Sequence, residues 1–109
     1  MFKKQIKSPA ELNCEMLIEM RENCANKLRG LVRRALGLEK MLSLLFEETP
    51  HRKTAETDFA ETKAKIIECI DRYDNLTLEY NICAETCGKY PSTITGHEIV
   101  LYEIQSKLF

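Results

Sequence analysis

The sequence predicts an all-α protein, in which a long antiparallel two-helix hairpin and a short third helix form a small helical bundle. The 109 residues include only four glycines and three prolines, too few for the many turns of an all-β fold. Apolar residues recur at steps of three and four over two long stretches, which is the spacing of one helix face. We therefore expect residues 1–109 to form a single helical domain, either a whole protein or the N-terminal domain of a longer one.

The first helix is predicted over about residues 9–47. Ser8 is a favourable N-cap, Pro9 suits the first helical position, and Glu11 completes a capping box. Pro50 ends the helix, because proline disfavours helical geometry in the residue before it. The apolar stripe of this helix comprises Cys14, Leu17, Met20, Cys24, Leu28, Leu31, Ala35, Leu38, Leu42 and Leu45.

The second helix is predicted over about residues 55–87, with Thr54 or Thr57 as its N-cap. Gly88 is a natural C-terminal cap, and Pro91 prevents much continuation. Because residues 51–54 form only a short polar connection, the two long helices are expected to pack antiparallel. The stripe of the second helix comprises Phe59, Ile66, Cys69, Ile70, Tyr73, Leu76, Tyr80, Cys83 and Cys87.

A third, shorter helix is predicted over about residues 96–108, after a capping box formed by Thr95 and Glu98. At a rise of about 1.5 Å per residue, it can cover only one end of the hairpin. Apolar surface is therefore expected to stay exposed near the interhelical loop and at the end of the chain, and such patches mark interaction sites. The predicted partner-binding residues are Leu38, Met41, Leu42, Leu45, Phe46 and Phe59, with Leu108 and Phe109 at the other end.

This surface predicts a non-enzymatic protein–protein interaction or assembly module that binds a protein partner, a second copy of itself, or both. The two histidines fall at predicted loops or caps, and no glycine-rich phosphate loop or paired-carboxylate motif is present. We expect neither an enzyme nor a bound cofactor.

Five cysteines lie within the predicted helices, and they support an alternative function. If the hairpin turns near residue 51, Cys14 lies opposite Cys87, with Cys83 one helical turn away. His97 follows at the start of the third helix, so these four residues are candidates for a Cys₃His zinc site. A redox-responsive Cys14–Cys87 disulfide is a further alternative. The favoured interpretation is reduced thiols packed in the core of a cytoplasmic or nuclear protein, because the basic N-terminus precedes no apolar signal segment.

Charge is divided unevenly along the chain. Residues 1–53 carry 11 Lys and Arg against 7 Asp and Glu, whereas residues 54–109 carry 5 against 10. We expect Arg29 to Arg34 to pair across the hairpin with Glu68, Asp71 and Asp74. With a pI near 6.1 and no apolar run long enough to span a bilayer, the sequence predicts neither nucleic-acid nor membrane binding.

Two glycines, Gly30 and Gly37, stand seven residues apart in the first predicted helix and share one side of it. A mid-helix glycine costs about 1 kcal/mol relative to alanine. Either these glycines allow another helix to approach closely, or they are tolerated at an exposed surface.

Overall fold

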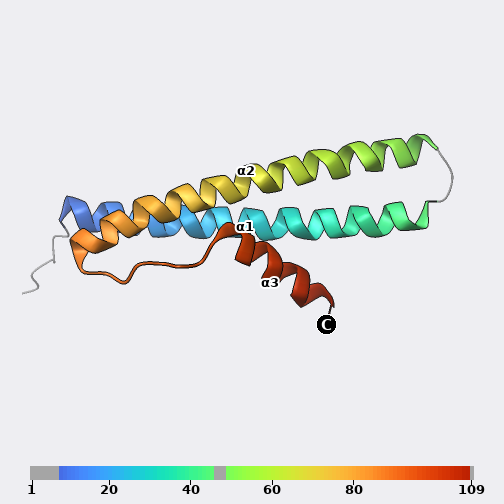
Figure 1. The fold of residues 1–109 in the computed structure, drawn as a ribbon. Coiled ribbons are helices and arrows are strands. Elements are labelled where there is room, and N and C mark those ends of the chain that lie inside the picture. Colours follow the sequence, from blue (N-terminus) through green and yellow to red (C-terminus); the bar gives the residue numbers. More distant parts are fainter. Residues whose placement is uncertain (1–7, 46–48, 109) are drawn as a thin grey trace, which may run out of the picture.

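The computed structural model describes residues 8–45 and 49–108, and it confirms the all-α fold (Figure 1). Helices α1 (Pro9–Leu44) and α2 (Pro50–Cys87) pack antiparallel as a long hairpin, and α3 (Gly96–Leu108) is the short third helix. Phe46 and Phe109 lie outside the described residues, as does the side chain of Leu108.

Local capping explains where the helices begin and end. The Ser8 hydroxyl accepts a hydrogen bond from the Glu11 amide at 3.2 Å, as the capping box predicts. Thr95 caps α3 in the same way, accepting from the Glu98 amide at 3.2 Å. Gly88 closes α2 with a φ of 69°, in the left-handed region that glycine adopts without steric cost.

The predicted start of the second helix was wrong by about one turn. Thr49 is its N-cap and accepts from the Arg52 amide at 3.2 Å, and Pro50 occupies the first helical position. The hydroxyls of Thr54 and Thr57 instead donate to carbonyl groups four residues earlier in α2. The turn of the hairpin therefore lies closer to the N-terminus than expected.

The hydrophobic core lies in the open end of the hairpin, which we define as residues 9–28 of α1 and 69–87 of α2. Small residues alternate with larger ones on the facing sides, and Cys14, Leu28 and Ala84 are wholly buried. Small side chains allow two helices to approach closely, as they do here. The buried members of this core are Cys14, Leu17, Cys24, Ala25, Leu28, Cys69, Ile70, Tyr73, Leu76, Tyr80, Cys83, Ala84 and Ile99.

Packing is thinner in the loop half of the hairpin, residues 32–45 and 49–66. Among the described residues there, Val32, Ala55 and Thr62 are the buried ones. Figure 1 shows the two helices diverging toward the loop. The molecule measures 70 × 25 × 22 Å and has a radius of gyration of 19.1 Å. A compact chain of this length would have a radius of gyration of about 13 Å.

The segment 88–95 returns along the hairpin, and α3 packs against its middle (Figure 1). Gly96 fits against the backbone of Ile70, and its amide donates to Asp74 Oδ1 at 2.8 Å. Further along α3, Arg33 of α1 donates to the buried Glu103 at 2.6 Å. The third helix therefore covers the middle of the hairpin, rather than one end as expected. None of the described helices has both the length and the apolar character needed to cross a membrane.

Candidate functional site

Apolar side chains gather around the loop half of the hairpin. We define the loop-end surface as Leu38, Met41, Leu42, Leu44, Leu45 and Phe59. Met41 and Leu44 are 50% and 66% exposed, and the other four are partly buried. Leu44 was not among the residues predicted from the sequence, because it lies beside the apolar stripe rather than in it.

Polar contacts tie the start of α2 to the end of α1 beside this surface. The Arg52 guanidinium donates to the Leu45 carbonyl oxygen and, at 3.0 Å, to Glu56. Lys63 lies over the Phe59 ring, with its Nζ 4.5 Å from the ring centroid. These contacts hold the tip of the hairpin together, but they leave its apolar side chains accessible.

The end of α3 lies on the loop half, not at the opposite end of the molecule. A shallow groove between α1 and α3 has an apolar floor of Leu36, Gly37 and Ile104. Lys40 and Lys107 flank it, which places the last turn of α3 near residue 40 of α1. The predicted contact region at Leu108 and Phe109 stays a prediction, since Phe109 and the Leu108 side chain lie outside the described residues.

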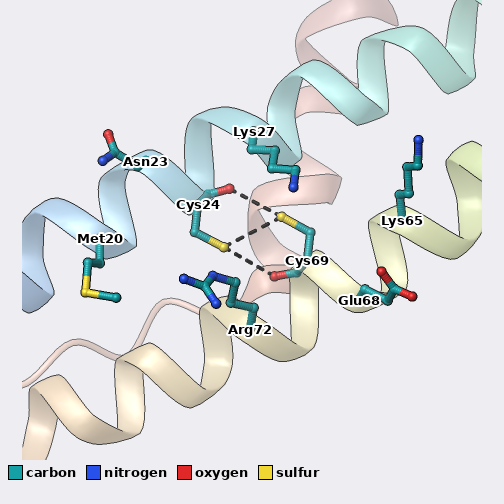
Figure 2. Close-up of a pocket in the computed structure, with 8 residues that line it drawn as sticks. All are labelled: Met20, Asn23, Cys24, Lys27, Lys65, Glu68, Cys69 and Arg72. Carbon is teal, nitrogen blue, oxygen red and sulfur yellow. Dashed lines mark hydrogen bonds between the residues drawn. The ribbon is translucent and has the colours of Figure 1, made fainter.

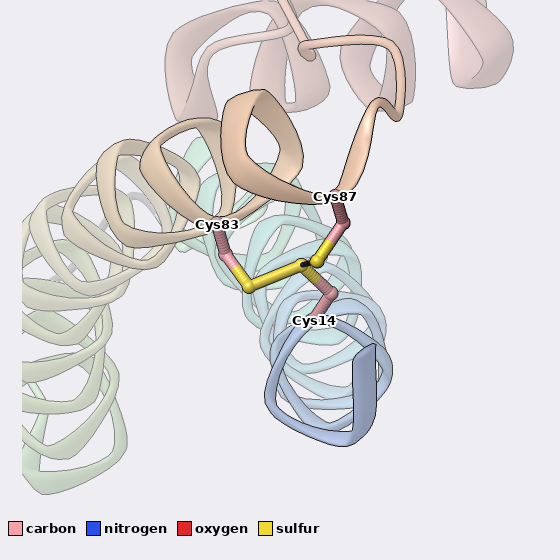
Figure 3. Close-up of side chains that lie close together, drawn as sticks. All are labelled: Cys14, Cys83 and Cys87. Carbon is pink, nitrogen blue, oxygen red and sulfur yellow. Dashed lines mark hydrogen bonds between the residues drawn. A yellow bond between two sulfur atoms is a disulfide. The ribbon is translucent and has the colours of Figure 1, made fainter. Parts of the chain in front are cut away.

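A thiol cluster occupies the open end (Figure 3). Cys14 and Cys83 form a disulfide between α1 and α2, with their Cα atoms 5.7 Å apart. The Cys87 sulfur lies 3.6 Å from the Cys14 sulfur, and all three sulfur atoms lie within 4.8 Å of one another. Cys14 is thus bonded to Cys83 rather than to Cys87, since the early turn of the hairpin shifts the register by about one helical turn. The disulfide also gives no support to the expectation that all five thiols are reduced.

His97 does not join this cluster. It is exposed at the start of α3, next to Gly96, which packs against Ile70. Ile70 precedes Cys83 by 13 residues of α2, or about 20 Å at the helical rise. The structure therefore brings together Cys14, Cys83 and Cys87 but separates the histidine from them, so the predicted Cys₃His set is not assembled.

A second cysteine pair, missed from the sequence, lies deeper in the hairpin (Figure 2). The sulfur atoms of Cys24 and Cys69 are 3.6 Å apart, and each lies 3.5 Å from the carbonyl oxygen of the other residue. Both residues are buried. Burial, together with the neighbouring Cys69 thiol, raises the pKa of Cys24 to about 11. Predicting this pair requires the correct hairpin register, which places Cys24 of α1 opposite Cys69 of α2.

Arg21 is a second residue that the sequence did not single out. Its guanidinium donates to the hydroxyls of Thr77 at 3.1 Å, Tyr73 at 3.0 Å and Ser92 at 2.8 Å. It also lies about 5 Å from the ring centroids of Tyr73 and Tyr80. Through these three hydrogen bonds, Arg21 anchors the returning segment to α1 and α2.

The basic stretch of α1 makes other ion pairs than those expected. Arg29 lies 4.0 Å from Glu22 on its own helix, and Arg33 pairs with Glu103 of α3. Asp74 accepts the amide hydrogen bond of Gly96. Arg33 and Asp74, which we expected to pair across the two long helices, therefore bind α3 instead.

Comparison with known proteins yields no family model, curated protein or solved structure that matches this chain.

Proposed function

We propose that this chain is a non-enzymatic protein–protein interaction module that associates through the loop-end surface, and that its partner is a second copy of the chain. The observation that carries this proposal is the loop half of the two long helices, where the apolar residues of the loop-end surface are only partly covered. Met41 and Leu44 are at least half exposed there, and the residues buried beneath them are few.

The accessible surface of the molecule supports an interface. The chain exposes 8421 Å², whereas a compact monomer of its 12.6 kDa mass exposes about 6,200 Å². The difference, about 2,200 Å², reflects the elongated shape of the hairpin, which leaves long helix faces open to a partner. An elongated hairpin with this much extra surface is typical of a subunit that packs against other helices.

Charge distribution favours a second copy as the partner. The first half of the chain is net basic and the second half is net acidic. Near the loop, Lys40 lies on α1, whereas α2 carries both signs of charge, with Lys53 close to Glu56 and Glu61. Because this region carries both signs of charge, a second copy packed side by side would let Glu56 and Glu61 of one chain face Lys40 and Lys53 of the other along an apolar seam.

Sedimentation velocity over a range of concentrations tests the proposal. The wild-type chain is expected to dimerise, and Met41→Glu combined with Leu44→Glu should give a monomer. Both side chains are at least half exposed, so their replacement leaves the core of each chain intact.

The matched control is Leu78→Glu combined with Ile82→Glu, which places two charges on exposed positions of the open end. This control should dimerise like the wild type. A wild-type chain that stays monomeric at high micromolar concentration contradicts the proposal. Loss of the dimer in the control but not in the loop-end variant would show that the wrong surface was chosen.

The thiol cluster supports a second candidate function, a metal-responsive thiol site. Once the Cys14–Cys83 bond is reduced, three converging thiolates offer soft ligands of the kind that zinc prefers. Metal analysis of reduced protein, purified without chelator, separates the two functions. Stoichiometric zinc that is lost in Cys87→Ser would favour the metal site, whereas the interaction module predicts none.

A further inference from the structure

We propose that Cys24 and Cys69 are a second disulfide site, so that the oxidised hairpin carries two cross-helix disulfides, Cys14–Cys83 and Cys24–Cys69, and keeps Cys87 as its remaining thiol. This proposal does not depend on the proposed function, because it concerns the open end and middle of the hairpin rather than the loop-end surface.

The geometry of the pair carries the inference. The two sulfur atoms face each other directly across the α1–α2 contact at 3.6 Å, as Figure 2 shows. Forming the bond requires them to close by about 1.5 Å, a movement within reach of side-chain rotation. Each sulfur also lies 3.5 Å from the carbonyl oxygen of the opposite residue, so the two backbones are already close at this level.

Neighbouring small residues explain why the helices are so close here. Ala25 follows Cys24 and is 3% exposed, and the two sulfur atoms contact each other at 3.6 Å. The Cys14–Cys83 pair lies nearer the open end, ten residues before Cys24 in α1 and fourteen residues after Cys69 in α2. Its Cα atoms are 5.7 Å apart, within the usual range for a disulfide. The same helix–helix contact therefore presents two cysteine pairs in succession.

The surroundings of the pair suit a small anionic disulfide as the oxidant. Lys27, Lys65 and Arg72 border the groove above the thiols, with Glu68 as its acidic residue (Figure 2). The positive charges of Lys27 and Arg72 also favour the thiolate form of Cys24, against the larger opposing effect of burial. Glutathione disulfide, which carries free carboxylates, is an oxidant of this class.

The reaction is two successive thiol–disulfide exchanges. The thiolate of one cysteine attacks a sulfur of glutathione disulfide, which forms a mixed disulfide and releases one glutathione thiolate. The thiolate of the second cysteine then attacks the protein sulfur of the mixed disulfide and releases the second glutathione. Two electrons pass from the protein thiols to glutathione disulfide, and the two thiol protons end on the two released glutathiones.

Peptide mapping after oxidation tests the proposal on the full-length chain. The protein is equilibrated with mixtures of reduced and oxidised glutathione, acid-quenched, alkylated under denaturing conditions and digested with trypsin. Trypsin cleaves after lysine and arginine, so each cysteine of the proposed pair falls on its own peptide. Cys24 lies on residues 22–27 and Cys69 on residues 66–72. Cys83 and Cys87 share the peptide 73–89. We expect residues 22–27 cross-linked to residues 66–72, and one alkylated cysteine in the whole chain.

Two variants sharpen the result. The first is a triple variant that keeps only the Cys24–Cys69 pair, because it carries Cys14→Ser, Cys83→Ser and Cys87→Ser. Its two remaining cysteines should still cross-link. Adding Cys69→Ser to this variant should leave a thiol that forms at most a mixed disulfide with glutathione. Circular dichroism verifies that each variant is helical. If a variant does not fold, the peptide map of the wild-type protein alone tests whether Cys24 and Cys69 are cross-linked.

The proposal is overturned if residues 22–27 and 66–72 remain alkylated in wild-type protein under glutathione conditions that keep Cys14–Cys83 oxidised. It is equally overturned if Cys24 or Cys69 becomes cross-linked mainly to Cys14, Cys83 or Cys87, or is recovered only as a glutathione adduct.

Discussion

At the scale of single residues, Arg21 makes several contacts between distant parts of the chain, and no feature of the sequence predicted them. Its side chain connects α1 to two hydroxyls of α2 and to Ser92 of the returning segment. Ser92 is held further by Asn81, whose side chain exchanges two hydrogen bonds with its backbone, at 2.8 and 3.0 Å. The returning segment is thus ordered by side-chain contacts rather than by secondary structure of its own.

Replacing Arg21 by methionine tests this role. The variant keeps most of the side-chain volume but leaves the hydroxyls of Tyr73, Thr77 and Ser92 without their donor. We expect the free energy of unfolding, measured by urea denaturation, to fall by about 2 kcal/mol. Arg29→Met is the matched control, because Arg29 makes only surface contacts with Asn26 and Glu22, and it should change stability by no more than about 0.5 kcal/mol. Equal losses in the two variants would contradict the anchoring role.

The Cys24 thiol predicts a pH dependence of stability. Its pKa is raised from 9.0 to about 11 in the folded chain, chiefly by burial, so the folded state holds this proton more tightly than the unfolded state does. The resulting stabilisation is fully present below about pH 9 and is lost as the pH rises through about 11. We therefore expect the stability difference between wild type and Cys24→Ala to shrink over this interval, in anaerobic urea denaturation that keeps both thiols reduced. A difference that stays constant from pH 8 to pH 11 would refute the assignment.

At the scale of the helices, the three helical glycines differ in their surroundings. Gly96 is in close contact with α2, whereas Gly30 and Gly37 face open space. A Cβ atom on Gly96 would lie 3.0 Å from both the Cα and the Cγ2 atoms of Ile70, and a backbone atom cannot move aside as a flexible side chain can. A Cβ atom on Gly30 or Gly37 would meet nothing within 4 Å. The helix α3 therefore needs Gly96, whereas α1 does not need its two glycines to receive α3.

Alanine substitutions distinguish these positions. Gly37→Ala should raise the free energy of unfolding by about 1 kcal/mol, because alanine is the better helix former and the site is open. Gly96→Ala should lower it by about 1 to 3 kcal/mol and detach the start of α3 from Ile70. Urea denaturation measures both. A stabilised Gly37→Ala monomer that associates less well would further show that a second chain approaches closely at this glycine.

At the scale of the whole molecule, the Cys14–Cys83 disulfide closes the hairpin at the end opposite its loop. The bond joins residues 69 apart in sequence and so removes much of the freedom of the unfolded chain. It secures the open end, while the loop half depends on the few residues buried there.

Reduction is expected to destabilise the chain by about 4 kcal/mol in the chain-entropy description of a loop this long. Thermal and urea unfolding with and without dithiothreitol measure the effect, with Cys69→Ser in all proteins to remove the second cysteine pair. The control also carries Cys14→Ser and Cys83→Ser, and its stability should not respond to dithiothreitol. An equal response in the control, or none in the protein that keeps Cys14 and Cys83, would argue against a stabilising disulfide.

The sequence by itself determined the three helices and their antiparallel order. Ser8, Thr95 and Gly88 act within a few residues of themselves, through hydrogen bonds to nearby amides or a left-handed backbone conformation. Such local interactions do not depend on what packs against the helix. The sparse core beside the loop was also predictable, since it follows from the lengths of the helices.

Only the tertiary structure decided the register of the hairpin and the position of α3. An apolar stripe of helical period matches itself again after a shift of three or four residues, so periodicity alone does not distinguish Cys14–Cys83 from Cys14–Cys87. The start of α2 at Pro50, the close contact of small residues around Cys24 and Cys69, and the fit of Gly96 against Ile70 select one register and one docking site. These are contacts between residues distant in sequence, and their energies depend on packing geometry that no local pattern encodes.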